Sequence, residues 1–477
     1  MKLKLAGKAP CVLLAALSLA TLLFCVTTRL GAEGGEPRYF AITNARIVPV
    51  SGPPMENGTV VIANGLIQAV GTNVAIPAEA WVIDGKGLTV YPGLIDAGDD
   101  LGIPKPEPAP AEARGRGRRR GAAPVPEHIS MGPEDRPQTS PWRVAADEVN
   151  PEDKRIESWR NAGFTTALVL PDDAIIAGQG SLIDLSGERA SQMVVESHAA
   201  LRIGLRTQVF GFPDSLMGVI SYLRQVTDDT AWYDAAEPIY AAHRNGIERP
   251  NVDHTEETMS QILWRHELVL FPANDIVEIP RAMRLAQEWN LHAALYGGQQ
   301  GYALADQIAA KKYQVIVKLK WPEAAKDPDP ENIPSLRELR FRDRAPASPA
   351  ALAKSGVKFA FSSGGTAEPK DILKNVRKAT AAGLSSDAAL RAFTLDAAEI
   401  LGVADRLGSI EPGKIANLVV ADGDLFGEKT KVKHVFVDGR HFEVHEIEKR
   451  HKPGAEGGDK PDEAQPEISS GDSEVAR

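Results

Sequence analysis

Short apolar runs alternate with helix-length segments through the middle of this chain. Strands are predicted at Thr165–Leu170, Leu268–Phe271, His292–Tyr296, Val315–Leu319 and Val357–Phe361. Helices are predicted between them, at Pro280–Trp289 and Ala303–Lys311. A strand followed by a helix, repeated along a chain, favours an α/β fold of the TIM-barrel type with parallel strands. In such barrels the chemistry lies at the carboxyl ends of the strands.

Two β-hairpins are predicted outside this region, one near each end of the chain. Residues 60–70 form two β-rich runs joined by Asn64-Gly65, and residues 434–444 form two more joined by Asp438-Gly439. Both dipeptides suit a two-residue turn that needs positive φ at its two central positions.

The composition sets broad limits on function. The chain has 477 residues, of which 43% are apolar and 25% are charged, an ordinary globular balance. This length suits a barrel with a small companion domain. The net charge of −10 argues against a nucleic-acid partner. Both cysteines, Cys11 and Cys25, lie near the N-terminus, so the rest of the chain has no thiol for a disulfide or a metal site.

Residues 1–32 are predicted to be a secretory signal peptide. Lysines within the first eight residues precede an almost wholly apolar run at residues 12–26, and small residues precede Glu33. We therefore expect export to the periplasm or the extracellular space, with a mature protein that begins near Glu33. The alternative is an uncleaved membrane anchor formed by residues 12–26, although that run is short for a full span. Membrane contact is expected only through this segment.

Two further stretches have the composition of unfolded chain. Residues 103–142 are rich in Pro, Gly, Ala and Arg, with an arginine-rich centre at residues 114–120. We expect a flexible insertion near the mouth of the barrel, although its basic centre could also contact an anionic surface or partner. Residues 452–477 are rich in Gly, Pro, Asp, Glu and Ser, and are expected to form a disordered tail.

Two motifs, far apart in the sequence, carry a resemblance to a known family. YPGLID occupies residues 91–96, and GLSSDAALRAFTLDAAEILGVADRLGSIEPGKIANLVVADGDL occupies residues 383–425. Both resemble the amidohydrolase superfamily, in the branch nearest imidazolonepropionase and the prolidase-like members. The resemblance covers residues 38–445. It implies a hydrolase that acts on C–N bonds other than peptide bonds, such as those of cyclic amides.

The resemblance also implies an arrangement of domains. In this family a small β-sandwich, built from both terminal segments, accompanies a (β/α)8 barrel. Here it predicts a discontinuous sandwich from residues 38–91 and 405–447. The barrel would then comprise residues 92–404, with the insertion at 103–142.

Members of this family hold zinc or another divalent metal at the barrel mouth, where it lowers the pKa of a bound water to about 7. The ligands are a His-x-His on the first strand, a Lys or Glu on a middle strand, a His on each of two later strands and an Asp on the last. By the resemblance, these positions are occupied here by Gly98 and Asp100, Asp184, Phe271 (preceded by Leu270), Tyr296 and Gly364.

None of these residues reproduces the family's ligand set, so no metal cofactor is expected. Asp100 could still hold a hard cation through oxygen. Asp99 is adjacent to Asp100, so the two side chains should point in different directions and not form an acid–base pair. Either carboxylate could simply cap the following turn.

Other candidate residues were weighed against ordinary structural roles. His198, His243, His254 and His266 lack metal-ligand spacing and are expected to be surface residues. Lys318 and Lys320 share one face of a strand at a period of two, and could place positive charge in the barrel mouth.

Three functions remain open from the sequence. The first is a non-catalytic or divergent relative that binds a small molecule in the barrel mouth, or a partner at its surface. The second is an active hydrolase that uses an oxygen-ligated metal or an unusual mechanism. The third is a scaffold that carries the arginine-rich insertion. The oligomeric state stays undetermined.

Overall fold

The computed structural model describes residues 38–104, 130–171, 174–187, 189–208, 211–324, 333–366 and 368–444. The predicted signal peptide, the arginine-rich centre of the insertion and the C-terminal tail lie outside these residues. Within the described ranges, no helix is both long enough and apolar enough to span a lipid bilayer.

Eight strands form a nearly closed barrel. In chain order they are β6 (Leu94–Asp99), β7 (Phe164–Val169), β8 (Ile176–Asp184), β9 (Val194–Ile203), β10 (Val269–Ala273), β11 (Ala293–Gly297), β12 (Gln314–Lys318) and β13 (Phe359–Ser362). Strands adjacent in the chain are adjacent in the sheet. β13 lies against β6, where the Ser362 hydroxyl donates a hydrogen bond to the Gly98 carbonyl. The predicted TIM-like barrel is confirmed.

One strand departs from the expected pattern. β8 pairs antiparallel with both of its neighbours, β7 and β9. Only residues 170–175 separate β7 from β8, too few for the helix that a parallel crossover requires. The short helix α3 (Ala190–Met193) then precedes β9. The other strands run parallel, and their carboxyl ends define the mouth of the barrel.

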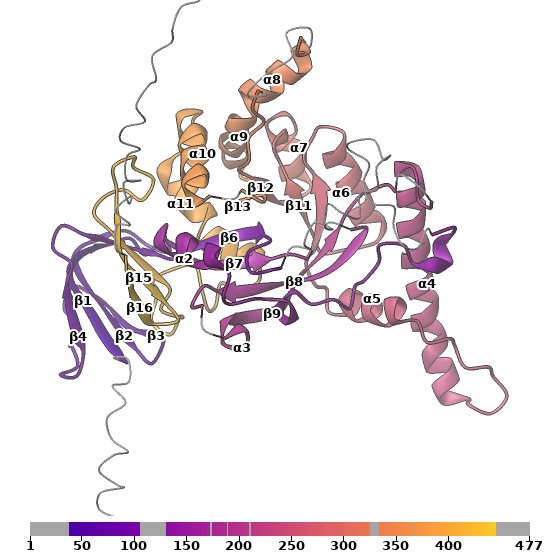
Figure 1. The fold of residues 1–477 in the computed structure, drawn as a ribbon, viewed down its shortest axis with the longest axis horizontal. Coiled ribbons are helices and arrows are strands. Elements are labelled where there is room, and N and C mark those ends of the chain that lie inside the picture. Colours follow the sequence, from indigo (N-terminus) through magenta and orange to yellow (C-terminus); the bar gives the residue numbers. More distant parts are fainter. Residues whose placement is uncertain are drawn as a thin grey trace, which may run out of the picture. The chain divides into compact units, whose positions relative to one another are not determined.

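Helices cover the outside of the barrel strands (Figure 1). They are α2 (Lys154–Asn161), α4 (Leu216–Ala242), α5 (His254–Trp264), α6 (Glu278–Glu288), α7 (Ala305–Ala310), α8 (Leu336–Arg344), α9 (Ser348–Lys354), α10 (Pro369–Ala381), α11 (Ser386–Ala392) and α12 (Leu395–Ile400). Short 3-10 turns are η2 (Pro133–Asp135), η3 (Ala145–Asp147), η4 (Gly301–Ala303) and η5 (Ala345–Ala347). α6 buries Ile279, Ala282, Met283 and Ala286, spaced as one helical face, against the strands.

Side chains alternate between the barrel interior and the helical layer. One buried cluster draws residues from all eight strands, including Leu168, Leu182, Leu270, Ala294, Ile316 and Ala360. The next residue on each of these strands belongs to a second cluster, shared with the surrounding helices: Val169, Ile183, Phe271, Leu295, Val317 and Phe361. The first set therefore fills the barrel, as the period of two in a β-strand requires.

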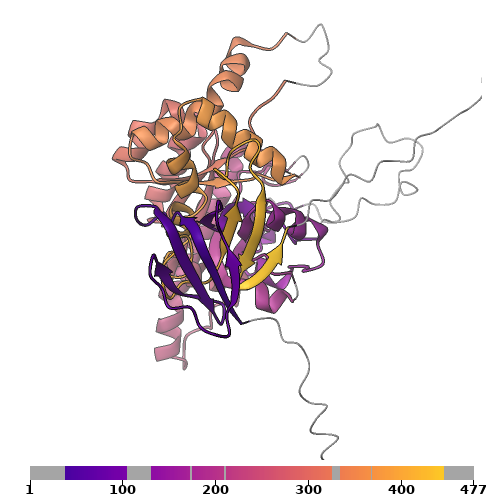
Figure 2. The same ribbon diagram turned by 90° about the vertical axis from the view of Figure 1, so that its left-hand side faces the viewer.

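The N- and C-terminal strands join in one further sheet, shown face-on in Figure 2. Its members are β1 (Tyr39–Ile47), β2 (Met55–Ala63), β3 (Leu66–Gly71), β4 (Trp81–Asp84), β5 (Thr89–Pro92), β14 (Leu418–Ala421), β15 (Val432–Val437) and β16 (Arg440–Glu443). β5 pairs antiparallel with β14, which brings the two ends of the chain together. The predicted discontinuous β-unit is thus present.

Both predicted hairpin turns are confirmed. Asn64 and Gly65 have φ values of 50° and 84°, and Asp438 and Gly439 have values of 51° and 71°. Positive φ at both central residues is the conformation that fits the twist of the paired strands.

The prediction of a flexible insertion at residues 103–142 is wrong for its last part. Residues 130–142 run along the amino-terminal end of β8, where Gln179 Nε2 donates to the Pro141 carbonyl at 3.0 Å. Thr139 is buried and lies 2.6 Å from the Tyr222 hydroxyl. The composition of this segment predicts a flexible loop. These polar contacts and the burial of Thr139 instead hold residues 130–142 against the barrel.

Candidate functional site

Tyr296 occupies the space beside Gly98, at the mouth of the barrel. A Cβ atom on Gly98 would lie 2.9 Å from Cε2 of Tyr296 and 3.0 Å from its hydroxyl oxygen. The Tyr296 hydroxyl lies 3.3 Å from Ser362 Oγ and 3.5 Å from the Gly98 carbonyl. Burial raises the pKa of Tyr296 to about 12, so the phenol stays neutral. The resemblance assigns both positions to metal ligands. Gly98 supplies no side chain there, and the Tyr296 ring lies where a side chain on Gly98 would be.

Lys318 fills the corresponding space beside Gly364. A Cβ on Gly364 would lie 3.3 Å from both Cβ and Cγ of Lys318. The φ of Gly364 is 64°, in the left-handed region that favours glycine. The Lys318 ammonium lies 4.3 Å from the centre of the Tyr296 ring, in cation–π contact. Arg202 also lies over this ring, with its guanidinium carbon 5.7 Å from the ring centre. Lys320, by contrast, lies beyond the strand and is exposed.

Asp100 is held away from the strand-end positions by an arginine. Arg155 Nη1 lies 2.6 Å from Asp100 Oδ1, and Arg155 Nη2 donates to the Asp100 carbonyl at 2.9 Å. Asp153 binds the same guanidinium, through Nε at 2.9 Å and Nη2 at 2.7 Å. Together the two carboxylates raise the pKa of Arg155, although its burial opposes this. The Asp100 carboxylate therefore belongs to an ion-pair network.

Two buried carboxylates under the mouth were not identified as site residues from the sequence. Asp96 Oδ1 accepts from the backbone N–H groups of Ser363 at 3.0 Å and of Gly98 at 3.2 Å. Asp99 Oδ1 accepts from the Asp100 N–H at 2.7 Å. Within the described part of the chain, Oδ2 of both Asp96 and Asp99 has no hydrogen-bond partner. Asp99 and Asp100 do point in different directions, as expected.

Burial is the main cause of the raised pKa values of Asp96 and Asp99. Desolvation raises the pKa of Asp96 to about 6 and, together with repulsion from Asp96, that of Asp99 to about 8. In the sequence, Asp96 is marked only by its position at the end of the YPGLID motif, which predicts a buried strand. A carboxylate in an apolar strand is uncommon, and that could have singled it out.

Asp184 and Phe271 do not lie at the mouth. Because β8 runs antiparallel, its carboxyl end lies at the opposite end of the barrel, where Asp184 pairs with Thr166. There Asp184 Oδ1 accepts from Thr166 Oγ1 at 2.8 Å and from Asn417 Nδ2 at 2.7 Å. Phe271 points out into the helical layer and its ring centre lies 6.1 Å from that of Trp289. The interior residue at that place on β10 is Leu270.

The residues at the family's ligand positions do not fit a zinc ion. Glycines 98 and 364 have no side-chain donor, and Tyr296 is a neutral phenol packed into the barrel. Among the described residues, no three or more His, Cys, Asp or Glu side chains are placed to hold a metal. None of His198, His243, His254 and His266 stands at the carboxyl end of a barrel strand. Structural or catalytic zinc needs at least three protein ligands.

A shallow pocket of about 440 Å³ opens at the rim of the mouth. It is lined by Asp100, Gly102, Ile103, Pro104, Asn150, Asp153, Arg155, Gly365 and Thr366. These residues come from the segment after β6, the start of α2 and the loop after β13. The lining offers carboxylate acceptors and backbone groups that could bind a small polar molecule.

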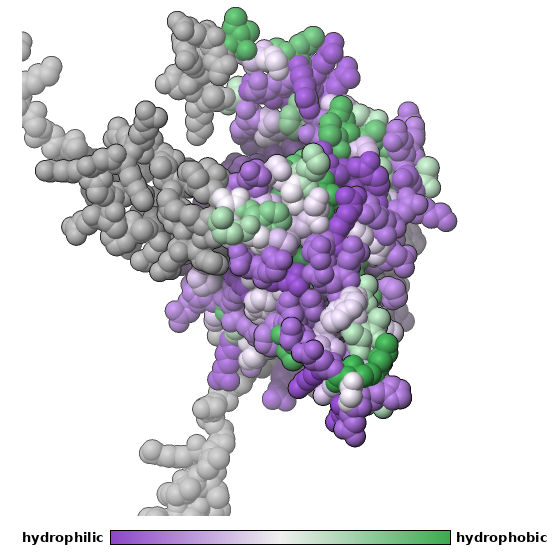
Figure 3. Space-filling view, turned by 90° about the vertical axis from the view of Figure 1, so that its right-hand side faces the viewer, coloured by the Kyte–Doolittle hydropathy of each residue, from purple (hydrophilic) through white to green (hydrophobic). Residues whose placement is uncertain are grey.

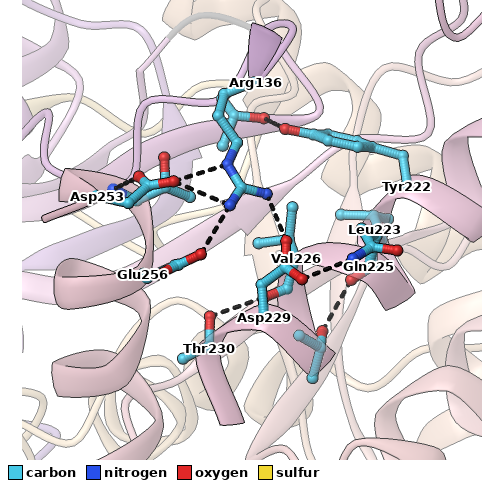
Figure 4. Close-up of polar contacts among 12 residues, drawn as sticks. Arg136, Tyr222, Leu223, Gln225, Val226, Asp229, Thr230, Asp253 and Glu256 are labelled. Atoms are coloured by element: carbon cyan, nitrogen blue, oxygen red, sulfur yellow. Dashed lines mark hydrogen bonds and ion pairs between the residues drawn. The ribbon is translucent and has the colours of Figure 1, made fainter. Parts of the chain in front are cut away.

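A second group of charges lies away from the mouth, around Arg136 (Figure 4). Its guanidinium lies 2.9 Å from a carboxylate oxygen of each of Asp229, Asp253 and Glu256. These partners come from α4 and from the start of α5, so Arg136 ties residues 130–142 to both helices. Because all three carboxylates contact Arg136 and join separate elements, we assign this cluster a structural role.

Comparison with known proteins defines the family. A model described as "Amidohydrolase family" matches residues 256–442. The solved structure of an amidohydrolase from Thermotoga maritima MSB8 has a TM-score of 0.70 at 25% sequence identity, covering 85% of this chain and 100% of that one. Together with the barrel and its discontinuous β-unit, these matches support the amidohydrolase superfamily, with the family model matching the C-terminal part of the chain.

More distant solved structures share the fold. One is an amidohydrolase with 18% identity and a TM-score of 0.52, covering 85% of this chain and 99% of that one. Another is a Xaa-Pro dipeptidase with bound methionine in its active site, at 16% identity and a TM-score of 0.50, covering 85% and 100%. No curated protein matches the sequence.

Proposed function

We propose that this protein is an amidohydrolase-superfamily member that has lost the family's metal-dependent hydrolysis and binds a small polar molecule at the barrel mouth. The observation that carries the proposal is the packing of Tyr296 on Gly98. In the family's ligand set, the position of Gly98 carries a metal-binding histidine. Here the Tyr296 ring lies in the space that such a side chain would take. Lys318 on Gly364 repeats the arrangement at the position of the family's proton-transferring carboxylate.

The consequence for catalysis follows from ligand chemistry. Without imidazoles at the mouth, zinc affinity is low and no bound water reaches a useful pKa. With glycine at position 364, no carboxylate stands on the last strand to protonate a departing amine. The substrate class of the family, C–N bonds of cyclic amides or amidines, then becomes the ligand class, bound without turnover.

The rim pocket is the proposed binding place. Its lining combines Asp100 and Asp153, which are paired with Arg155, with Thr366 from the loop after β13, so it offers both charged and neutral polar groups to a ligand. A thermal-shift panel of cyclic amides and amidines should find compounds that raise the melting temperature in a saturable way. Thr366→Trp should fill the pocket and abolish that shift, while Gly52→Trp, at an open surface site, should not. Shifts that are equal in both variants would reject this pocket.

A second candidate function is favoured by the unpartnered oxygens of Asp96 and Asp99. Two buried carboxylates, with the Ser362 hydroxyl and the Gly98 carbonyl nearby, are the oxygen donors that a hard cation prefers. In that case the protein would be a hydrolase with an oxygen-ligated metal. Asp99→Asn would then abolish both Mn²⁺ binding and amide hydrolysis. If the wild type binds no Mn²⁺ or Ca²⁺ by calorimetry, this candidate fails.

We also propose that the protein is exported through residues 1–32, with retention as an anchor through residues 12–26 as the alternative. The proposal rests on the basic start, the apolar run and the small residues that precede Glu33. Intact-mass measurement on cell fractions tests it. A mature species beginning near Glu33 in the exported fraction is expected, and a full-length cytoplasmic product would contradict export.

A further inference from the structure

Beyond Thr230, no residue of α4 is fully buried. The buried residues of this 27-residue helix are Val219, Tyr222, Leu223, Val226 and Thr230. Asp234 accepts a hydrogen bond from Ser260 of α5. Beyond that point the helix runs past α5 (Figure 1). We call residues 231–242 the α4 arm.

An arm of this kind is unstable by itself in water. Isolated helices shorter than about 12–15 residues are marginal even with favourable sequences. Pro238 lies inside the arm and lacks the N–H that would bond to the Asp234 carbonyl. The base of the arm is fixed, because the Arg136 cluster holds Asp229 and the start of α5. The free part therefore needs a surface to pack on.

The arm carries an apolar stripe. Trp232 is 60% exposed and Ile239 is 55% exposed, and both are large apolar side chains that are usually buried. They are seven residues apart, so they project from the same side of a helix to within about 20°. Ala235 and Ala242 extend the same stripe and are exposed. In Figure 3 this side of the molecule is mostly hydrophilic, with a small hydrophobic group near its lower end.

The order of residues along the stripe is self-complementary. If a second arm lies antiparallel, with a twofold axis between Ala235 and Ala236, Trp232 falls opposite Ile239 of the other copy. The small alanines at the centre let the two helices approach closely. On the same register Asp228 falls opposite His243, a carboxylate acceptor opposite an imidazole donor, and both side chains are exposed. A twofold pairing uses the same surface on both copies, and such symmetry is the commonest in homo-oligomers.

We propose that the α4 arm is a homodimerisation element, in which two copies of this chain pair their Trp232–Ile239 stripes antiparallel. The arm offers a smaller surface than a standard interface of about 800 Å² per partner, so the dimer is expected to form at micromolar concentration. The pairing leaves the barrel mouth of each copy unaltered. It does not depend on the function proposed for that mouth.

Analytical ultracentrifugation of the full chain tests the proposal across about 1–100 µM, the range expected for a small interface. The wild type should show a reversible monomer–dimer equilibrium. Ile239→Asp should raise the dimer dissociation constant at least about tenfold, through a charge buried against Trp232. The matched control is Ala241→Asp, which adds the same charge to the opposite side of the same arm and should dimerise like the wild type. Circular dichroism of both variants verifies that the fold is retained.

Cross-linking tests the register. Ala235→Cys lies next to the predicted axis and should give a covalent dimer on mild oxidation, in excess of any formed by the parent chain through Cys11 or Cys25. Met217→Cys, exposed at the other end of α4, should not. A wild type that is monomeric throughout the range overturns the proposal. So does an Ile239→Asp variant that dimerises normally, or a dimer in which Ala235→Cys fails to cross-link.

Discussion

Tyr296 stands where a side chain on Gly98 would have to go, with only 2.9 Å between its Cε2 atom and a Cβ built on that glycine. The two residues lie on strands that are far apart in the chain, β6 and β11. The Tyr296 ring fits in its place only because position 98 has no side chain. A large ring at the mouth of β11 requires an empty position on β6. At the two positions that the resemblance assigns to metal ligands, the pair therefore forms ordinary core packing.

Restoring a histidine at position 98 should therefore damage the fold. Gly98→His would overpack the contact with Tyr296 and should lower the free energy of unfolding by about 1–3 kcal/mol. Combining it with Tyr296→Ala should cost less than the sum of the two single changes, because the second removes the clash. Urea unfolding of the four proteins in this cycle measures the coupling. Gly52→His, at an open site, is the control and should be nearly neutral.

Asp184 should make stability depend on pH. Burial raises its pKa to about 7 in the folded protein, well above the ordinary value of an aspartate, about 3.9. The folded state then holds the proton more tightly than the unfolded state. This contribution is fully present below about pH 4 and is lost as the pH rises through about 7. Asp184→Asn should flatten the fall in unfolding free energy between pH 4 and 8, by an amount on the order of 4 kcal/mol.

Asn417→Asp is the complementary change at the same contact. Asn417 Nδ2 donates to Asp184 Oδ1 at 2.7 Å, so an aspartate here would set two carboxylates together. We expect the variant to be much less stable than the wild type at pH 8 and closer to it at pH 5, where a shared proton relieves the repulsion. Equal destabilisation at both values would show that Asp184 is not the partner that matters.

Arg136 should be essential for stability. Replacing it with methionine leaves Asp229, Asp253 and Glu256 without their shared cation in a half-buried place. Loss of one partner from such a cluster typically costs about 3–5 kcal/mol. Chemical unfolding of Arg136→Met tests this. Arg224→Met, which breaks an exposed pair with Glu288, should leave the unfolding midpoint almost unchanged.

The two parts of the insertion should respond differently to deletion. Removing residues 106–125 and joining the ends with a short linker should leave the melting temperature nearly unchanged, as the composition predicts. Removing residues 130–142 should lower it strongly, because Arg136 and Thr139 leave with the segment. Calorimetry on both deletions separates them. A large drop for the first would show that it packs on the barrel.

The barrel was predictable because its signals are local. Apolar runs with a period of two, and helical faces such as that of α6, are encoded within ten or so residues. The same holds for the turns at Asn64-Gly65 and Asp438-Gly439. The direction of β8 was less accessible, since only the short connection from β7 to β8 reveals it. Because β8 is reversed, Asp184 lies at the end of the barrel opposite the mouth, and the prediction that it is a site residue at the mouth is wrong.

The site was predictable in part. The resemblance singles out Gly98, Tyr296 and Gly364 as predicted site positions, but the packing of one on another depends on strand neighbours that the sequence does not show. Phe271 was off by one residue, and in a β-strand one residue turns the side chain to the other face. The sequence gives no sign that Asp96 and Asp99 are both buried, because burial is a property of the assembled barrel.

The most direct test of the proposed loss of metal chemistry is elemental analysis of the mature protein, purified without a histidine tag. We predict far less than one zinc, manganese or iron per chain, and a melting temperature that a chelator does not alter. Near-stoichiometric metal, together with amide or cyclic-amide hydrolysis that the chelator abolishes, would contradict the proposal.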